Sequence, residues 1–488
     1  MALIPKVMST QHPDNARPAP FADATGVVKG DGEVDEAVDV FGIGCDEQMW
    51  DSEGKEADNH VVRKLLTGYS RVFDSLRLGR DVALTLRVPN PSVERNMRKS
   101  MVEALQSIPS AWDTATTFYG EEADAPIQEV ILPLTTSAWE LAMVEAYYRR
   151  VIVEQEEHAL LGDQIVKDWV GEFYPKELRV IPLVEDLESM LTCDSIVEEY
   201  VRGRDLPHQR VFLARSDPAL NYGVVTAELV LKVALQRLHR LEERTGLGIY
   251  PIIGAGGVPF RGHLTPLNVD RAFTEYPSAH TLTVQSAFKY DYARDDVQRG
   301  IAEILAHEKS EPVPVDEARA REVIDRSRAE YQSQVQLLAS FISNVAAYVP
   351  RRRERRMHVG LFGYGRTLGG GVTLPRAIGF SAALYSIGVP PELLGMAGLS
   401  PNDLEFVREV YPSLDGDLRA ALRFTNEQRV RELLGEKYVR LVAEFADDID
   451  RVHEGLTSAV WAGLDRGDAA VNVFNYVEEA AQLRHFLG

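Results

Sequence analysis

Eight short apolar runs recur along the first 290 residues of this chain, and most are followed by a stretch with helical periodicity. Each run is rich in Val, Ile and Leu and ends in polar or glycine residues. Continuous apolar strands that alternate with helices predict a parallel sheet covered on both faces. Eight such units predict an α/β fold, a closed (β/α)8 barrel of the TIM type. The runs are Ile4–Thr10, Val40–Asp46, Asp81–Val88, Ile127–Leu134, Leu178–Glu185, Gln209–Ser216, Gly248–Ala255 and His280–Ala287.

The helical stretches agree with this interpretation. Within Leu220–Gly246, apolar residues recur on one face at helical spacing, and Gly246 is well placed to end the helix. The pattern changes after Pro314. From there to the end helices dominate, and Met357–Phe362 is the one run that predicts a strand. We therefore expect a barrel over residues 1–310 and an all-helical region over residues 311–488, which packs on the barrel and supplies loops to its mouth.

Composition excludes several classes of function. The net charge of −21 disfavours nucleic acid or an anionic membrane as a partner. No apolar run is long enough for a transmembrane helix, and no signal segment opens the chain, so we expect a cytoplasmic protein. Two cysteines indicate reduced thiols and exclude a cysteine-based zinc site. Five arginines within residues 351–356 are interpreted as a solvated or inter-subunit surface.

Polar and charged residues gather where the predicted strands end. In a (β/α)8 barrel the active site forms at the C-terminal ends of the strands. A histidine, several carboxylates, two arginines and a glycine-rich loop would therefore share one face, which suits an anionic, phosphorylated substrate and a divalent cation. These positions are Gln11-His12, Cys45-Asp46-Glu47, Arg87, Thr135–Ser137, Glu185-Asp186, Ser216-Asp217, Gly254–Arg261 and Gln285.

Two of the carboxylates are candidate metal ligands. Glu185 and Asp217 each follow a predicted strand, and these two strands are neighbours along the chain. Mg²⁺ is commonly held by one or two carboxylates, with water and substrate oxygens completing its shell. Pro218 follows Asp217, so capping of a helix is the alternative role for that aspartate.

Two glycine-rich segments are candidates for phosphate binding. In GAGGVPFRGH (254–263), Gly256 and Gly257 would let backbone N–H groups approach phosphate oxygens, and Arg261 adds a permanent charge. The second segment, residues 361–380, carries Arg366 and Arg376. It lacks the third glycine and the acidic residue of a dinucleotide fingerprint. We interpret it as a loop that closes over a bound phosphate.

Together these motifs resemble the short, archaeal-type phosphoenolpyruvate carboxylases, and the resemblance runs from end to end. STQHPDN is highly specific and is similar to the Thr-Ala-His-Pro-Thr-Glu signature of the long-form enzymes. The segments that carry the resemblance are MSTQHPDN (8–15), CDEQMWDSEGKEAD (45–58), ILPLTTS (131–137), IPLVED (181–186), ARSDPALNYG (214–223) and GAGGVPFRGHL (254–264).

The resemblance implies a role for each candidate residue. His12 corresponds to the essential histidine, Glu185 and Asp217 to the metal ligands, and Arg87, Arg261 and Arg376 to arginines around the substrate. Ala255 stands where the long form has its first loop arginine, so Arg366 is our candidate for part of the missing charge.

The resemblance also implies the chemistry. Phosphoenolpyruvate and bicarbonate would give oxaloacetate and phosphate through carboxyphosphate and a metal-held enolate, an anaplerotic carbon fixation by a carbon–carbon lyase. It implies Mg²⁺ or Mn²⁺, no biotin, and a homotetramer. A Mg²⁺-dependent barrel enzyme of the phosphonopyruvate or isocitrate lyase type is the alternative, although such enzymes usually place a cysteine in the site. A non-catalytic barrel used as a binding module is a third reading.

Overall fold

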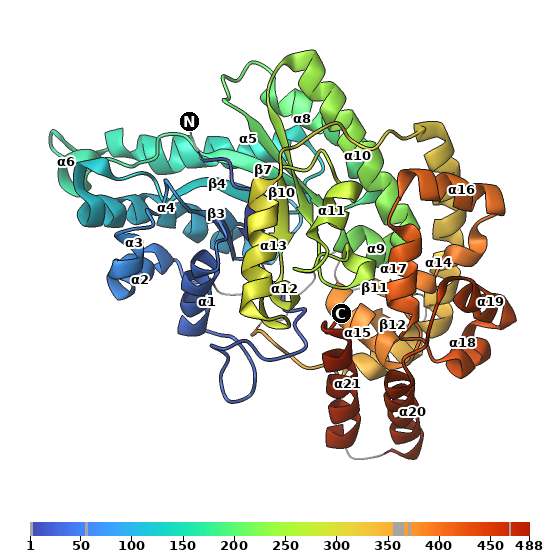
Figure 1. The fold of residues 1–488 in the computed structure, drawn as a ribbon. Helices are drawn as coiled ribbons and strands as arrows, with labels where there is room; N and C mark the ends of the chain where they lie inside the picture. Colours follow the sequence, from blue (N-terminus) through green and yellow to red (C-terminus); the bar gives the residue numbers. More distant parts are fainter. Residues whose placement is uncertain (1–2, 54–56, 355–365, 369–371, 468–469) are drawn as a thin grey trace.

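The protein forms a closed barrel of eight parallel strands (Figure 1), in the order β1-β10-β9-β8-β7-β4-β3-β2. The computed structural model describes residues 3–53, 57–354, 366–368, 372–467 and 470–488. The barrel confirms the predicted fold class, and seven of the eight apolar runs contain one of its strands. The strands are β1 (Val7–Ser9), β2 (Glu47–Asp51), β3 (Ala83–Arg87), β4 (Ile127–Leu132), β7 (Arg179–Val184), β8 (Gln209–Ala214), β9 (Ile249–Gly254) and β10 (Thr281–Val284).

The second strand was wrongly predicted. The run at Val40–Asp46 forms the end of helix α1 (Asp31–Gly42) and the turn after it, and β2 follows directly. The apolar side chains of that run pack as the last turn of a helix, whereas EQMWD places charged residues inside the barrel. Consequently Cys45, Asp46 and Glu47 lie at the wrong end for the site. Asp46 accepts hydrogen bonds from the backbone N–H groups of Lys6 (2.9 Å) and Val7 (2.8 Å) instead.

A layer of buried charge crosses the barrel interior near the start of its strands. Arg210, the second residue of β8, donates to Glu47 of β2 at 2.7 and 2.8 Å and to Glu129 of β4 at 2.9 Å. All three side chains are buried. A buried charge is tolerated when it is paired and hydrogen-bonded in this way. The layer fills the barrel at its amino end and leaves the carboxyl end for the site.

The predicted helix over Leu220–Gly246 is broken once. Gly223, with φ +88°, separates α9 (Ser216–Tyr222) from α10 (Val224–Thr245), and Gly246 ends α10 in the left-handed conformation as expected. The other helices among the barrel strands are α2 (Val61–Gly68), α3 (Ser70–Phe73), α4 (Arg98–Tyr119), α5 (Ala138–Tyr147), α6 (Val166–Val170), α7 (Leu187–Leu191), α8 (Cys193–Val201), α11 (Val269–Glu275), α12 (Ser286–Tyr290) and α13 (Arg294–Ala306).

Helices follow the barrel and lie against one side of it, coloured orange to red in Figure 1. The longest is α14 (Glu317–Ala346), whose first N–H groups are capped by the Asp316 carboxylate. The strand predicted at 357–362 lies outside the described residues. A short hairpin of β11 (Arg366–Leu368) and β12 (Val372–Leu374) was not predicted. The remaining helices are α15 (Ala377–Ser386), α16 (Pro401–Val410), α17 (Leu414–Leu422), α18 (Glu427–Leu434), α19 (Glu436–Phe445), α20 (Arg451–Arg466) and α21 (Ala470–Arg484).

The arginine-rich segment is only in part the solvated surface that its charge suggested: of its three described arginines, Arg351 is exposed, whereas Arg352 and Arg353 are buried. Arg353 is buried and pairs with Glu33 at 2.9 Å and with Glu36, both on α1. Arg352 is also buried, and it donates to the Asn15 carbonyl at 3.3 Å and to Glu478 at 2.6 Å. Arg352 therefore ties the segment before α15 to the loop after β1, and Arg353 ties it to α1.

An arm projects from the barrel between β4 and β7, where Figure 1 shows α6 far from the barrel axis. This arm (residues 138–170) contains α5, a small antiparallel hairpin of β5 (Ala159–Leu161) and β6 (Gln164–Ile165), and α6. Its surface is unusually apolar, because Trp139, Leu161 and Trp169 are 62%, 83% and 78% exposed.

Within the described ranges, no single helix is both long and apolar enough to cross a bilayer; only α15 and the segment Pro391–Gly398, bent by 96°, reach that length as a pair.

Candidate active site

A cavity of about 180 Å³ opens at the C-terminal ends of the strands. A smaller cavity of about 40 Å³ shares His12, Arg87, Ser216 and Asp217 with it and adds Glu185 and Gln285. The structure thus brings together six of the residues singled out in the sequence. These are His12, Arg87, Glu185, Asp217, Arg261 and Arg376.

His12 sits in the loop that follows β1. Its Nδ1 lies 2.9 Å from the hydroxyl of Thr10, which is buried. Two residues later, Asp14 accepts hydrogen bonds from the backbone N–H groups of Ala287 (2.7 Å) and Gly257 (3.2 Å). Asp14 therefore ties this loop to the loop after β9 and to the start of α12 (Ser286–Tyr290), which follows β10.

Arg87 reaches the cavity from the end of β3, but its charge is already paired. Its Nε and Nη2 donate to Asp51 at 2.9 and 2.7 Å, and its Nη1 lies 3.0 Å from Glu53. All three side chains are buried. The bidentate pairing holds the guanidinium in one plane at the cavity wall. Any substrate contact by Arg87 uses the N–H groups that face away from Asp51.

Asp217 and Glu185 supply two carboxylates to the smaller cavity from the neighbouring strands β8 and β7. Burial raises the pKa of Asp217 above its usual value. Arg376 lowers this pKa and Glu53 raises it. The N-cap residue of α9 is Arg215, and Asp217 lies within the first turn of that helix, so the alternative role as its N-cap is not the one it has.

These carboxylates fit a divalent cation. Both oxygens of Glu53 are buried and accept no hydrogen bond, despite the ion pair with Arg87. Burial, with Glu53 nearby, raises the pKa of Glu94 to about 8. The oxygens of Glu53, which lack a hydrogen bond, are therefore an observation that fits a cation at this side of the cavity. Among the described residues, no three acidic, histidine or cysteine side chains form a complete metal cage.

Arg261 is the most extensively held side chain of the site. It sits in a short 3-10 turn after β9 and donates from Nε to Ser216 (3.0 Å), from Nη2 to Gln285 (2.6 Å) and from Nη1 to the Gly488 carbonyl (2.7 Å). Asp14 lies 3.5 Å from Nη1. Burial lowers the pKa of Arg261, whereas Asp14 and Asp217 raise it. The network fixes the direction of a positive charge at the cavity.

The amide groups of Gly256 and Gly257 are engaged within the protein. Gly256 donates to the Arg261 carbonyl at 2.7 Å and Gly257 donates to Asp14. A Cβ on Gly256 would stand 3.0 Å from both the Arg261 guanidinium carbon and the Gln285 amide oxygen. This glycine therefore gives room to the Arg261–Gln285 pair. Direct contact of these amides with phosphate stays a prediction.

The second glycine-rich segment is described only in part. Arg376 caps the start of α15, and with Ala377 and Ile378 it lines the cavity. Arg366 opens β11, but its side chain lies outside what the structure describes, as do residues 363–365 and 369–371 of the predicted closing loop. The helical region therefore contributes to the mouth of the barrel through α15.

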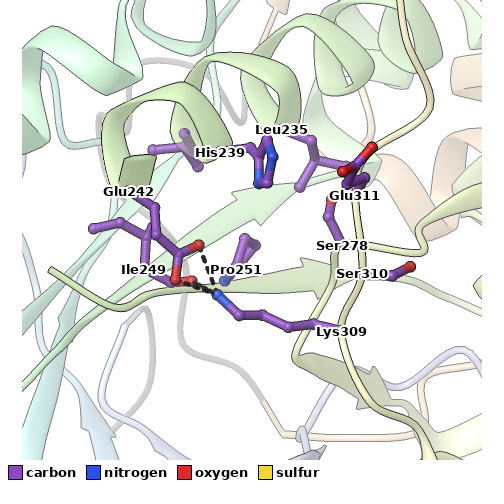
Figure 2. Close-up of a pocket in the computed structure, with 10 residues that line it drawn as sticks. Leu235, His239, Glu242, Ile249, Pro251, Ser278, Lys309, Ser310 and Glu311 are labelled. Atoms are coloured by element: carbon purple, nitrogen blue, oxygen red, sulfur yellow. Dashed lines mark hydrogen bonds and ion pairs between the residues drawn. The ribbon is translucent and has the colours of Figure 1, made fainter. Parts of the chain in front are cut away.

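A larger cavity of about 320 Å³ lies at the other end of the barrel, beside the start of β9 (Figure 2). Lys309 is its cation, and Figure 2 shows that its ammonium group is taken up by Glu242 at 2.6 and 2.7 Å and by the Ile249 carbonyl at 2.8 Å. The cavity holds none of the residues singled out in the sequence. Its position also disfavours it, because barrel enzymes use the carboxyl end of the strands.

Cysteine chemistry is absent from the candidate site. Cys193 opens α8, is fully buried in the hydrophobic core and does not line either cavity at the strand ends. Burial raises the pKa of its thiol. The cysteine expected for an enzyme of the phosphonopyruvate or isocitrate lyase type is thus not in place.

Sequence reasoning missed three residues that support the site: Thr10, Asp14 and Glu53. Asp14 and Glu53 contact residues that follow or end neighbouring strands but are distant in the sequence, so no local spacing indicates their partners. Thr10 had a local signal, since a hydroxyl two residues before a histidine can turn back to its ring. Arg87 was found, but the two carboxylates that neutralise it were not assigned.

Comparison with known proteins agrees with the motifs. The profile of the phosphoenolpyruvate carboxylase family matches residues 4–488. Phosphoenolpyruvate carboxylase of Methanothermobacter thermautotrophicus is 47% identical over 99% of this chain and 100% of its own length. The enzymes of the same name from Halobacterium salinarum (45%) and Pyrococcus abyssi (46%) are matched over 100% of both chains. The chain therefore belongs to the phosphoenolpyruvate carboxylase family, in its short, archaeal-type form.

Proposed function

We propose that this protein carboxylates phosphoenolpyruvate with bicarbonate, giving oxaloacetate and inorganic phosphate. The observation that carries the proposal is that His12, two carboxylates and three arginines line two cavities at the carboxyl ends of the strands, and that His12, Arg87 and Asp217 line both. The set suits an anionic substrate, a proton transfer and a divalent cation. Family membership supports the same activity.

The reaction begins when a bicarbonate oxygen attacks the phosphorus of phosphoenolpyruvate. The bond from phosphorus to the enol oxygen breaks, which leaves carboxyphosphate and the enolate of pyruvate. Arg261 and Arg376 face this region and stabilise charge on the phosphoryl oxygens. We assign a further share of that charge to Arg366, and we keep Gly256 and Gly257 as candidate substrate contacts.

His12 then accepts the proton of carboxyphosphate. Loss of that proton lets carboxyphosphate release CO₂ and phosphate, and the methylene carbon of the enolate attacks the CO₂. An imidazole suits this step, because its ordinary pKa of ~6.5 lies close to neutral pH. The apolar wall formed by Ala377 and Ile378 helps to keep water from protonating the enolate, which would yield pyruvate instead.

Glu185 and Asp217 are the residues that would hold the metal. Mg²⁺ or Mn²⁺, when bound, supplies a Lewis acid that withdraws electron density from substrate oxygens and orients them. The chain's own part is to present these two carboxylates from neighbouring strands with the three arginines around them. We propose that no biotin takes part, because bicarbonate is activated by phosphate transfer.

Isotope incorporation tests the proposed activity. We expect purified protein supplied with phosphoenolpyruvate, Mg²⁺ and ¹³C-bicarbonate to form oxaloacetate carrying one ¹³C in its new carboxyl group. Oxaloacetate is trapped as malate by a coupling dehydrogenase and examined by mass spectrometry. Omission of bicarbonate or addition of a metal chelator serves as the control. Formation of unlabelled products alone would reject the carboxylase and favour the lyase-type alternative.

We also propose that the enzyme is a cytoplasmic homotetramer, with the arm (residues 138–170) as one of its contacts with a second copy. Three large apolar side chains stand exposed there, and such a patch marks an interaction surface. Its rim carries both signs of charge, including Arg149 with Glu154 and Lys167 with Glu157. A mixed rim suits self-association, because it can pair with its own symmetry mate.

Charge placed on the arm is expected to break that contact. We expect the double variant Leu161→Glu, Trp169→Glu to form a smaller assembly at micromolar concentration, because four buried apolar side chains per dimer contact would become charged. Size-exclusion chromatography with light scattering measures the mass. Leu337→Glu, on the exposed face of α14, is the matched control. A double variant with the wild-type mass, or a monomeric wild type, would contradict the proposal.

A further inference from the structure

The hydroxyl of Thr10 contacts the imidazole ring of His12. The Oγ1–Nδ1 distance is 2.9 Å, and Thr10 is fully buried. Among the described residues, this imidazole is the one polar group that the hydroxyl contacts. A buried hydroxyl with a single partner is placed for that partner, since leaving the hydroxyl unmatched costs free energy.

The backbone of Thr10 is fixed as firmly as its side chain. Its N–H donates to the Val284 carbonyl of β10 at 3.0 Å, and its carbonyl accepts from Lys289 Nζ at 3.1 Å. Lys289 is itself buried and also contacts Ser9 Oγ (3.0 Å) and Glu36 (3.1 Å). The hydroxyl therefore has a fixed position relative to the barrel, and His12 takes its orientation from it.

Orientation and tautomer are coupled in a neutral imidazole, because one ring nitrogen carries the proton and the other carries the lone pair. If Nδ1–H donates to Thr10, the lone pair is on Nε2. If Thr10 donates to Nδ1, the proton is on Nε2 and that nitrogen cannot act as a base. The hydroxyl can serve in either direction, so its direction decides which nitrogen takes up a proton.

We propose that Thr10 is a positioning residue: through its contact with Nδ1 it fixes the orientation of the His12 ring, and with it the nitrogen that exchanges a proton with carboxyphosphate. This inference rests on the proposed function and deepens it. The arrangement follows the general logic of catalytic bases, in which a third group orients the base. Thr10 itself does not line the cavity.

The test compares Thr10→Val, which keeps the shape but removes the hydroxyl, with Thr10→Ser, which retains it. We expect Thr10→Val to lower kcat for oxaloacetate by about 10–100-fold, a loss typical of supporting contacts. KM for phosphoenolpyruvate and the Mg²⁺ requirement should stay unchanged. The amount of oxaloacetate per phosphate released should fall and pyruvate should rise, because the enolate forms but is not carboxylated. Thr10→Ser should return the wild-type ratio.

Thr281→Val is the matched control. Thr281 is also a fully buried threonine of the barrel, but it lies at the amino end of β10, and its hydroxyl donates to the Pro5 carbonyl at 2.5 Å. It should leave the product ratio unchanged. If Thr10→Val does not yield folded protein, Thr10→Ala removes the same hydroxyl with a smaller side chain. An unchanged ratio in the hydroxyl-free variant, or a Ser variant as impaired as the Val variant, would overturn the inference.

Failure of this inference can be told apart from failure of the proposed function. If the wild type incorporates no bicarbonate, the proposed activity is wrong. If the wild type carboxylates and His12→Asn does so equally well, the role of the base is wrong. If the wild type carboxylates and His12→Asn does not, but Thr10→Val forms as much oxaloacetate per phosphate released as the wild type, only the positioning role of Thr10 is rejected.

Discussion

Replacing His12 with Asn is expected to lower the rate of oxaloacetate formation by at least about 10²–10⁴-fold, the contribution of a positioned general base. Asn keeps polarity and similar size at the cavity, so the arginines and carboxylates around it should remain in place. Phosphate transfer does not need the imidazole, and some phosphate and pyruvate should still appear. A coupled assay for oxaloacetate, run beside an assay for inorganic phosphate, measures both products.

A second histidine serves as the control for this substitution. His239 lines the cavity at the amino end of the barrel (Figure 2), away from the candidate site. His239→Asn should leave both products at wild-type rates. Carboxylation by His12→Asn at close to the wild-type rate would show that another group removes the proton.

Replacing Asp217 with Asn is expected to raise the Mg²⁺ concentration needed for half-maximal activity by at least about tenfold. The change removes one of two carboxylates that we assign to the metal, and an amide oxygen is a poorer ligand for a hard cation. The positive charge of the three arginines near Asp217 would then be less neutralised, and their repulsion would further disfavour a cation there. Activity as a function of Mg²⁺, and Mn²⁺ binding followed by electron paramagnetic resonance, measure the effect.

Asp186 offers a matched control for Asp217. It stands beside Glu185, but its carboxylate caps α7 by accepting from the N–H groups of Glu188 (3.1 Å) and Ser189 (3.0 Å). Asn is an equally good cap, so Asp186→Asn should change neither stability nor the Mg²⁺ titration. A titration of Asp217→Asn that coincides with the wild type would remove Asp217 from the metal ligands.

The sequence predicted the barrel and most of the residues at its mouth because both follow from topology. In a parallel barrel, whatever comes directly after a strand must lie at the carboxyl end. Glu185, Asp217 and Arg261 therefore share a rim although 76 residues separate the first from the last. His12 joined them for the same reason. No distance was needed for that step, only the assignment of strands.

The prediction failed where a strand faces the charged interior of the barrel. β2 contains Glu47, Gln48 and Asp51. Because this strand is polar, the more apolar run at the end of α1 was predicted as the strand instead. Glu47 is tolerated because Arg210 lies across the barrel, and Asp51 because Arg87 lies beside it. Such pairings join residues up to 163 positions apart, so a local pattern does not contain them.

The charge of the arginine-rich segment misled for a related reason. From the sequence alone, Arg352 and Arg353 are expected on a solvated surface. In the structure both are buried, because Arg352 pairs with a carboxylate of α21 and Arg353 with a carboxylate of α1. The division of the chain at residue 310 stays a prediction. It falls in the connection between α13, which ends at Ala306, and α14, which begins at Glu317.

The charge layer of Arg210, Glu47 and Glu129 determines by which route substrates enter and products leave. Because these side chains block the barrel axis at its amino end, the axis is open only toward the carboxyl ends of the strands, as far as the described residues show. Both reactants must come in, and both products must go out, past the same guanidinium groups. Inorganic phosphate that leaves the site therefore competes with the next phosphoenolpyruvate for the same arginines.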